Sequence, residues 1–247
     1  MSPSDRSRSD SSSNSNASAD ADADTDRESK PESAPAPDLA GLVIAGGYST
    51  RFGDEDKAVA DLAGTPMIRR VVDRLAAVTD AVVVNCREDQ RGAIAAALEG
   101  CAPTIEFALD PVEDRGPVAG IGTGLEAVDE TYGREFATVV ACDMPFVDPD
   151  LLELLFERAR DADADGAVVQ LEDGWYQTTQ AVYRTEPMAR ACAETLESDD
   201  KRIVAALERV DYVTVAEKVL EDADVDDATF ESLDTKEALE AAATRLE

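Results

Sequence analysis

Short apolar runs alternate with longer amphipathic stretches along the first two thirds of the chain. The runs predict buried strands, and the stretches between them carry apolar residues at helical spacing. Strands that are apolar without strict alternation are typical of a parallel sheet covered on both faces. The sequence therefore predicts a three-layer α/β fold, Rossmann-like, with a mostly parallel central sheet and helices on both faces. We expect strands at 42–45, 81–84, 105–109 and 136–141, and helices at 66–77, 89–98, 117–128 and 149–159.

The pattern after residue 160 is less regular. It predicts three further strands, two helices between them, and a closing helix. The closing helix has Asp234 as its expected cap, because Glu237 follows three residues later as in a capping box. The ranges expected here are strands at 167–171, 175–183 and 212–215, a helix at 187–196, and another from about Lys201.

Residues 1–38 differ in composition from everything that follows. They contain Ser, Asp, Ala and Pro but no aromatic or β-branched aliphatic residue, so they cannot bury enough apolar surface to fold. We predict a disordered acidic tail at 1–38 and a single folded domain at 39–247. The chain carries a formal charge of −31, and nine acidic against four basic residues in the tail leave about −26 for the domain.

This charge limits the partners that the chain can bind. A surface of this sign repels polyanions and argues against nucleic acid as a partner. It also suggests adaptation to high salt, where self-repulsion is screened. No signal peptide and no apolar run of membrane-spanning length is visible, so we expect a cytoplasmic protein with no membrane partner. Four scattered cysteines and the absence of His argue against structural zinc and a His-based triad.

The segment LVIAGGYSTRFGDEDK at 42–57 is the most informative part of the sequence. A buried strand leads into Gly46 and Gly47, whose backbone amides can approach an anion closely. Arg51 and Lys57 follow and supply the cations that a triphosphate needs. The spacing excludes a P-loop and the dinucleotide-binding fingerprint. The alternative is a tight strand-to-helix turn with incidental charges; the cations at this spacing favour the phosphate site.

Three polar residues are expected at the ends of strands, where ligands bind in such sheets. Asp143 is suited to Mg²⁺ held by one carboxylate plus phosphate oxygens; alternatively it caps the next helix, which Asp148 can do instead. Asp110 has the two acceptor oxygens that match guanine N1–H and N2–H₂, or it forms a turn before Pro111. Asn85 either contacts ligand or closes a turn.

The 44–57 segment resembles the LAGGxSxRxGxDK signature of the nucleotidyltransferases typified by molybdenum cofactor guanylyltransferase. Further segments match that family in the same order, and the resemblance covers essentially 41–245. Phe52, Ser232 and Asp234 depart from the usual Met and two Asn, and the acceptor region at 175–179 lacks the family's frequent His-Pro. The supporting segments are GTPM (64–67), VVVN (82–85), RGPVAGI (115–121), CDMPF (142–146) and TFESLDTKEAL (229–239).

The resemblance implies a nucleotide-diphospho-sugar-transferase-like fold and transfer of GMP from GTP to the phosphate of molybdopterin, with Mg²⁺ as cofactor. It implies Arg51, Lys57 and Asp143 as catalytic residues and Asp143 as the metal ligand. The acceptor phosphate is already ionised and needs no general base, so catalysis is positioning and electrostatic stabilisation. The nucleotide-binding residues that the resemblance implies are Ile44, Ala45, Gly46, Gly47, Lys57, Asn85, Asp110 and Asp143.

Other functions remain open at this point. Related enzymes on the same scaffold transfer CMP to molybdopterin, or GMP to cobinamide phosphate or phospholactate. A non-catalytic GTP-binding partner of molybdoenzymes is a second class, and molybdoenzymes or other cofactor-assembly proteins are candidate partners in either case. An NAD-binding oxidoreductase would need a GxGxxG turn followed by an acidic ribose ligand, which the sequence does not show.

Overall fold

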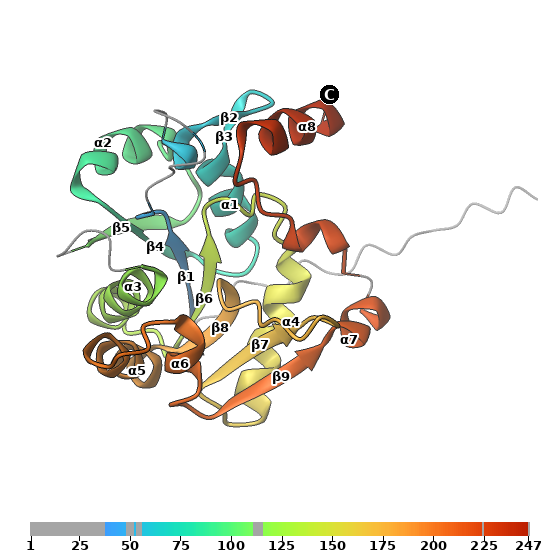
Figure 1. The fold of residues 1–247 in the computed structure, drawn as a ribbon. Coiled ribbons are helices and arrows are strands. Elements are labelled where there is room, and N and C mark those ends of the chain that lie inside the picture. Colours follow the sequence, from blue (N-terminus) through green and yellow to red (C-terminus); the bar gives the residue numbers. More distant parts are fainter. Residues whose placement is uncertain (1–37, 48–51, 53–55, 111–115, 224, 247) are drawn as a thin grey trace, which may run out of the picture. The chain divides into compact units, whose positions relative to one another are not determined.

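A computed structural model describes residues 38–47, 52, 56–110, 116–223 and 225–246, all within one compact unit, Ser33–Glu247. The predicted tail at 1–38 lies outside the described residues except for Asp38. The main sheet has seven strands in the order β5-β4-β1-β6-β8-β7-β9 (Figure 1). These are β1 (Leu39–Ile44), β4 (Ala81–Cys86), β5 (Thr104–Leu109), β6 (Phe136–Ala141), β7 (Gly166–Gln170), β8 (Gln180–Arg184) and β9 (Tyr212–Ala216).

The predicted fold class is confirmed. Every neighbouring pair in the sheet is parallel except those that involve β8, which is antiparallel to β6 and β7. None of the described helices is long and apolar enough to cross a membrane. The helices are α1 (Met67–Leu75), α2 (Glu88–Ala97), α3 (Pro117–Tyr132), α4 (Pro149–Asp161), α5 (Thr185–Glu197), α6 (Ile203–Leu207), α7 (Glu217–Asp222) and α8 (Lys236–Leu246), with 3₁₀ turns η1 (Lys57–Val59) and η2 (Asp227–Phe230).

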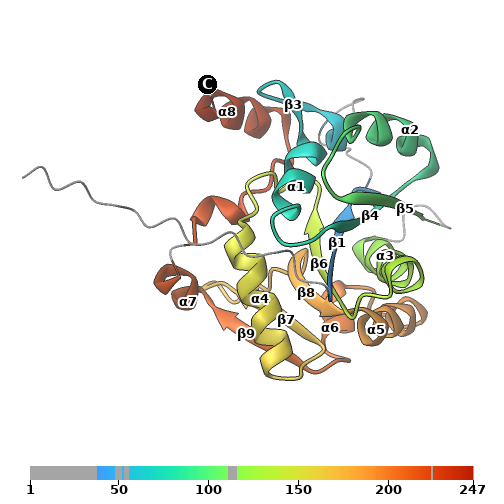
Figure 2. The ribbon, with the colours of Figure 1, turned by 180° about the vertical axis from the view of Figure 1, so that it is seen from behind.

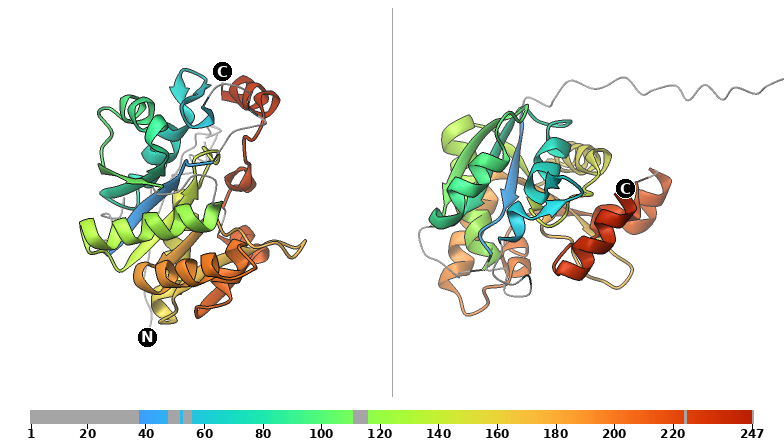
Figure 3. Two further views of the ribbon diagram at one scale, coloured as in Figure 1. Left: turned by 60° about the vertical axis from the view of Figure 1, so that its left-hand side comes forward. Right: turned by 90° about the horizontal axis from the view of Figure 1, so that it is seen from above.

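Alternate residues of each strand point to opposite faces of the sheet, and two separate apolar clusters result. On one face Val43, Val84 and Val140 pack against α1, α2 and α4. On the other face Leu42 and Val83 pack against α3 and α5. Figure 1 shows α3, α5 and α6 on the near side, and the reverse view in Figure 2 shows α1 and α4 covering the far side. Helices α3 and α5 run side by side (Figure 3).

The register of the parallel strands places their carboxyl ends level with one another. Ile44 at the end of β1 pairs with Asn85 of β4 on one side and with Ala141 of β6 on the other. The chain passes from β1 outward to β4 and β5 and then returns to β6, so strand order reverses between β1 and β6. A reversal of this kind leaves a crevice at the carboxyl ends, where open α/β sheets bind ligands.

The structure also corrects parts of the sequence-based prediction. Residues 175–179 were expected to be strand, but only a bridge between Gln170 and Tyr176 precedes β8. Asp234 was expected to cap the closing helix; instead the hydroxyl of Thr235 accepts from Ala238 N at 3.1 Å, which leaves Asp234 available for another contact. The capping prediction failed because adjacent Thr and Asp are both good caps, and sequence alone does not choose between them.

A two-stranded hairpin and helix α7 were not predicted. The hairpin strands, β2 (Asp61–Leu62) and β3 (Thr65–Pro66), are too short to show a periodic pattern. Their turn has positive φ at both central residues, Ala63 and Gly64, as a type I′ turn requires. Helix α8 lies beside this hairpin in Figures 1 and 3, and Leu62 and Leu233 join Ala242 of α8 in a small third apolar cluster.

Candidate functional site

A cavity of about 330 Å³ opens at the carboxyl edge of the sheet, at the crevice between β1 and β6. Its walls come from the glycine turn after β1, the loop after β6, the start of α3, the loop before β8 and the segment after η2. The lining residues are Ile44, Ala45, Gly47, Lys57, Pro117, Ala141, Cys142, Asp143, Met144, Gln177, Thr179, Phe230 and Ser232.

Charged and polar side chains gather at one wall of the cavity, and we call them the ion cluster. Its members are Lys57, Asp143 and Ser232, which line the cavity, and Asp234, which contacts Lys57. The Lys57 ammonium lies 2.6 Å from Asp143 Oδ2 and 2.9 Å from Asp234 Oδ1. The Ser232 hydroxyl donates to the same Asp143 oxygen at 3.1 Å. Two carboxylates thus share one ammonium at the cavity.

Local structure determines where each member of the ion cluster lies. Lys57 is the first residue of η1, whose start is capped by the Asp56 carboxylate accepting from Ala58 N at 3.0 Å. Asp143 follows β6, and the preceding residue is tied to β1 by Cys142 N donating to Ile44 O at 3.0 Å.

The capping role considered for Asp143 belongs to another residue. The Asp148 carboxylate accepts from Asp150 N at 2.9 Å and caps α4. The Asp143 carboxylate is therefore not needed at the start of α4, and it faces the cavity.

The electrostatics of the ion cluster favour a charged lysine. Burial disfavours the ammonium form of Lys57, but attraction to Asp143 and hydrogen bonds to Asp143 and Asp234 outweigh this and raise the Lys57 pKa above its usual value. Burial also raises the pKa of the neighbouring Cys142 thiol, and the Asp143 charge adds to that shift. At neutral pH Lys57 is therefore an ammonium ion, and the neighbouring Cys142 is a neutral thiol.

A second polar pair, which we call the base end, lies at the ends of β4 and β5. Asn85 is fully buried, and its amide donates to Asp110 Oδ1 at 2.8 Å and to Ala108 O at 3.2 Å. Asn85 Oδ1 is buried without a hydrogen-bond partner among the described residues. Burial raises the pKa of Asp110, although the Asn85 hydrogen bond and the charge of Arg87 oppose the shift.

Two glycines make room for this pair. A methyl group at Gly46 would lie 2.3 Å from Asp110 Oδ2, and one at Gly120 would lie 2.4 Å from Asn85 Oδ1. Both distances are far below van der Waals contact, so any larger residue would displace the pair. The glycine after β1 is therefore needed for close packing against Asp110, in addition to the backbone freedom that its sequence context suggested.

Arg87 and Gln90 brace the glycine turn from α2. The Arg87 guanidinium donates to Gly46 O at 3.1 Å and to Gly47 O at 3.0 Å. Gln90 is buried, and its amide donates to Ala45 O at 3.1 Å. These bonds fix the orientation of the carbonyl groups of the turn. In a trans peptide the N–H points opposite to the carbonyl group, so the same bonds fix the direction of the N–H groups.

The comparisons with known proteins identify the family of this chain. The family model described as the MobA-like NTP transferase domain matches residues 41–211. The chain belongs to the MobA-like NTP transferase family. A relative from Natronomonas pharaonis, named a probable molybdenum cofactor guanylyltransferase, is 52% identical over 85% of this chain and 98% of its own length. A relative of the same name from Methanosarcina acetivorans is 32% identical over 81% of this chain and 88% of its own length.

Solved structures of low identity share the fold of this MobA-like transferase. Molybdopterin-guanine dinucleotide biosynthesis protein A from Archaeoglobus fulgidus superimposes with a TM-score of 0.68 at 22% identity, covering 84% of this chain and 98% of that one. A 4-diphosphocytidyl-2C-methyl-D-erythritol synthase from Anaerococcus prevotii gives 0.61 at 13% identity, covering 84% and 97%. At these identities the two structures show that the fold is shared, and nothing further.

The structure groups the site residues predicted for this MobA-like transferase at one edge of the sheet, with one exception. Ile44, Ala45, Gly47, Lys57 and Asp143 line the cavity, and Gly46, Asn85 and Asp110 form the adjoining base end. Arg51, the exception, lies outside the described residues.

Four side chains that hydrogen-bond to predicted site residues were not themselves predicted: Arg87, Gln90, Ser232 and Asp234. Arg87 and Gln90 come directly after the strand that ends at Cys86, so their position in the chain was a usable signal. For Asp234 the only signal in the sequence was that it stands where the family usually has Asn.

The ion cluster of the MobA-like transferase contains one carboxylate oxygen that could hold a divalent metal ion. Mg²⁺ prefers hard oxygen ligands and often takes one or two carboxylates with substrate phosphates. Asp143 Oδ2 accepts from Lys57 and Ser232, while no described residue donates a hydrogen bond to Oδ1. The described residues contain no group of three or more His, Cys, Asp or Glu arranged around an ion. Asp143 Oδ1 is thus the oxygen suited to a metal that also binds phosphate.

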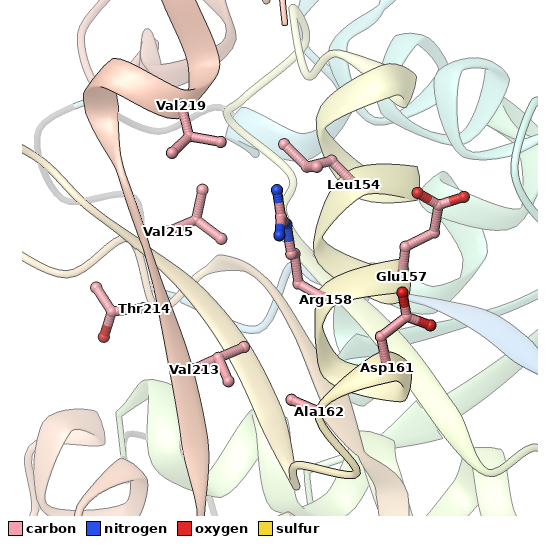
Figure 4. A pocket seen from close by; sticks show the side chains of 9 residues that line it. All are labelled: Leu154, Glu157, Arg158, Asp161, Ala162, Val213, Thr214, Val215 and Val219. Carbon is pink, nitrogen blue, oxygen red and sulfur yellow. The ribbon is translucent and has the colours of Figure 1, made fainter. Parts of the chain in front are cut away.

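A larger cavity of about 500 Å³ lies elsewhere in the MobA-like transferase, between α4, β9 and α7 (Figure 4). Val213, Val215 and Val219 form one side, and Leu154 of α4 forms another. The Arg158 guanidinium points into the middle of the space. The residues that line this cavity form no cluster of nucleophilic or metal-binding groups. The larger cavity is therefore not the candidate functional site.

Proposed function

We propose that this MobA-like transferase moves GMP from GTP to the phosphate of a molybdopterin-type acceptor and releases pyrophosphate. The contact between Lys57 and Asp143 at the carboxyl edge, beside the glycine turn, carries the proposal. It brings together a cation for phosphate and a carboxylate for a metal from positions 86 residues apart. The names of the Natronomonas pharaonis and Methanosarcina acetivorans relatives support guanine and the molybdenum cofactor.

The base end provides guanine recognition in this proposal. Asn85 holds one oxygen of Asp110, and the second oxygen lies beside Gly46 at the surface of the turn. A carboxylate accepts from both N1–H and N2–H₂ of guanine, whereas adenine offers no such pair of donors. The half-buried position of Asp110 strengthens this discrimination, because hydrogen bonds are stronger away from bulk water.

The ion cluster provides phosphate binding. The backbone amides after Gly46 and the Lys57 ammonium neutralise the phosphates, and Arg51, which lies outside the described residues, is proposed to share this role. Asp143 would hold Mg²⁺ through its Oδ1 atom. The ion would supply charge neutralisation and orientation of the phosphate oxygens.

The reaction needs no general base from the chain. An ionised phosphate oxygen of the acceptor forms a bond to the α-phosphorus of GTP, and the bond from that phosphorus to the pyrophosphate oxygen breaks. Negative charge grows on the leaving pyrophosphate, where Lys57 stabilises it. The chain thus contributes alignment of acceptor and phosphate together with charge stabilisation, both of which can be large effects.

The acceptor binds, in this proposal, on the β8 side of the cavity. Gln177 and Thr179 precede β8 and line the same cavity as Lys57 and Asp143. They replace the His-Pro frequent in the family, so hydroxyl and amide groups would contact the acceptor. Molybdoenzymes or other cofactor-assembly proteins are proposed as recipients of the product. All four cysteines are unpaired, which supports the proposal of a cytoplasmic location.

The decisive experiment is a pyrophosphate-release assay with purified protein, Mg²⁺ and molybdopterin. GTP, CTP and ATP are supplied separately and then in competition, and the dinucleotide product is identified by mass spectrometry. We expect pyrophosphate only with GTP and only when acceptor is present. GTP binding without pyrophosphate release would contradict catalysis, and release with CTP would reassign the base. EDTA is expected to abolish product formation.

A further inference from the structure

The Lys57 ammonium has two carboxylate partners, and the more distant one in sequence has no role in the function described so far. Asp234 lies 177 positions from Lys57 and forms a 2.9 Å ion pair with it. Its side chain is 49% exposed, against 12% for Asp143. An ion pair with so much solvent access contributes little to the stability of a fold, which points to a role in the site instead.

The segment that carries Asp234 is held at two points just before this residue. Upstream, Thr229 is fully buried; its hydroxyl accepts from Gln180 at 2.7 Å and from Asp148 N at 2.9 Å. Next to Asp234, Leu233 N donates to Asp143 O at 2.9 Å, and the Leu233 side chain is buried. The backbone at Asp234 is therefore fixed relative to Asp143 itself.

We propose that Asp234 is a positioning residue that holds the Lys57 ammonium at the phosphate site throughout the reaction. The inference rests on the role proposed above for Lys57. In the structure Asp143 is the closer partner of Lys57. A dication on Asp143 would repel the ammonium and withdraw charge from that carboxylate. Asp234 then remains as the anion that keeps Lys57 within reach of the phosphates.

The geometry favours this division of work between the two carboxylates. Ser232 and Lys57 both bind Asp143 Oδ2, so the orientation of Asp143 is defined from the segment after η2 as well as from β6. Asp234 contacts the ammonium through Oδ1 and comes from the segment between η2 and α8. A lysine held at two points loses less entropy when a phosphate binds than a mobile one does.

The test compares Asp234→Ala, Asp234→Asn and Asp234→Glu with the parent protein in steady-state GMP transfer. For Asp234→Ala we expect a kcat about tenfold lower, because small misplacement of a catalytic group is costly, with the KM for GTP changed less than the kcat. Asp234→Asn keeps an accepting oxygen and is expected to recover part of the rate. Asp227→Asn removes one negative charge from an exposed position in the same segment and is expected to behave as the parent.

A double-mutant cycle separates positioning from a general structural effect. If Asp234 acts through Lys57, then Lys57→Ala with Asp234→Ala is no slower than Lys57→Ala alone. The thermal midpoint of Asp234→Ala is expected to stay close to that of the parent. In protein labelled at lysine, the NMR signal of the Lys57 side chain is expected to report greater mobility in Asp234→Ala; Lys57→Arg assigns the signal among five lysines.

The outcomes distinguish this inference from the proposed function. If Lys57→Ala keeps the parent rate, the role of Lys57 fails and the inference fails with it. If Lys57→Ala is inactive while Asp234→Ala turns over like the parent, only the inference is overturned. Additive losses in the double-mutant cycle, or unchanged Lys57 mobility, would also overturn it.

Discussion

The two ends of the site are built in different ways. At the base end, Asn85 and Asp110 are short side chains fixed by strand ends and packed against Gly46 and Gly120. At the ion cluster, the long side chain of Lys57 lies between two carboxylates from distant parts of the chain. The first end is defined by steric fit and the second by charge.

This difference corresponds to two tasks. Recognition of a planar base requires donors and acceptors at fixed positions, which close packing around small residues provides. Phosphate transfer moves charge during the reaction, and a cation that neighbouring anions hold in place can stabilise this charge where it develops. The comparison predicts that substitutions at the base end alter selectivity and affinity, whereas those at the ion cluster alter the rate.

The largest effect is expected for Lys57→Ala. Removing one preorganised stabilising group costs roughly 10²–10³ in kcat elsewhere, and here it also leaves Asp143 and Asp234 without their shared counter-ion. Steady-state GMP transfer measures the change. Lys218→Ala, at an exposed lysine of α7, is the matched control and should keep the parent rate. If Lys57→Ala keeps the parent kcat, the prediction that the ion cluster controls the rate is wrong.

Asp110→Asn is expected to change base selectivity more than rate. Replacing a charged acceptor with a neutral amide lowers the preference for GTP over ATP by roughly 10–100-fold, from the usual strength of hydrogen bonds to charged groups. Competition binding measures this preference. Asp199→Asn, at an exposed aspartate, is the control for the same chemical change. Unaltered selectivity would assign guanine recognition to another group.

The same carboxylate predicts a pH dependence. Burial raises the pKa of Asp110, so its proton returns at a higher pH than for an ordinary aspartate. The ionised form accepts both guanine donors; selectivity for GTP is therefore full above the raised pKa and falls as the pH falls through it. Asp110→Asn is expected to flatten this profile, and a parent profile that is already flat would contradict the assignment.

A smaller effect, roughly tenfold on GTP affinity, is expected for Gly46→Ala, because overpacking of this kind costs about 1–3 kcal/mol. The added methyl group would lie 2.3 Å from Asp110 Oδ2. Calorimetric titration with GTP measures the loss. Gly92→Ala adds the same group on α2, where nothing lies within 4 Å, and should bind normally. Equal affinity of the two variants would show that the base end tolerates displacement.

The smallest effect concerns the thiols, one of which lies next to each end. Burial, with a contribution from the charge of Asp110, raises the pKa of Cys86 to about 12, and burial raises that of Cys142 as well. In native protein at about pH 8, iodoacetamide should label the half-exposed Cys101 and leave GMP transfer unchanged. Mass spectrometry identifies the labelled sites. If Cys142 is labelled early and GTP prevents this labelling, the ion cluster is more accessible to solvent than the buried position of Cys142 indicates.

The sequence by itself determined the sheet and its edge. Apolar runs such as 81–84 and 136–141 are local patterns. Gly46 and Asp143 each follow such a strand within two residues, so parallel pairing alone brings them to one edge. Asp148 as the cap of α4 was also readable, since N-caps depend on neighbours within a few residues. Local physics was sufficient wherever the interacting groups are close in the chain or fixed by strand register.

Only the tertiary structure decided which side chains meet across the site. Asp234 was expected to cap a helix and instead pairs with Lys57, because the packing of Leu233 and the bonds of Thr229 return the closing segment to the sheet. Arg87 binds the carbonyl groups of a turn 40 residues earlier. Such contacts depend on how separate elements pack in three dimensions, and no periodicity or local spacing records that packing.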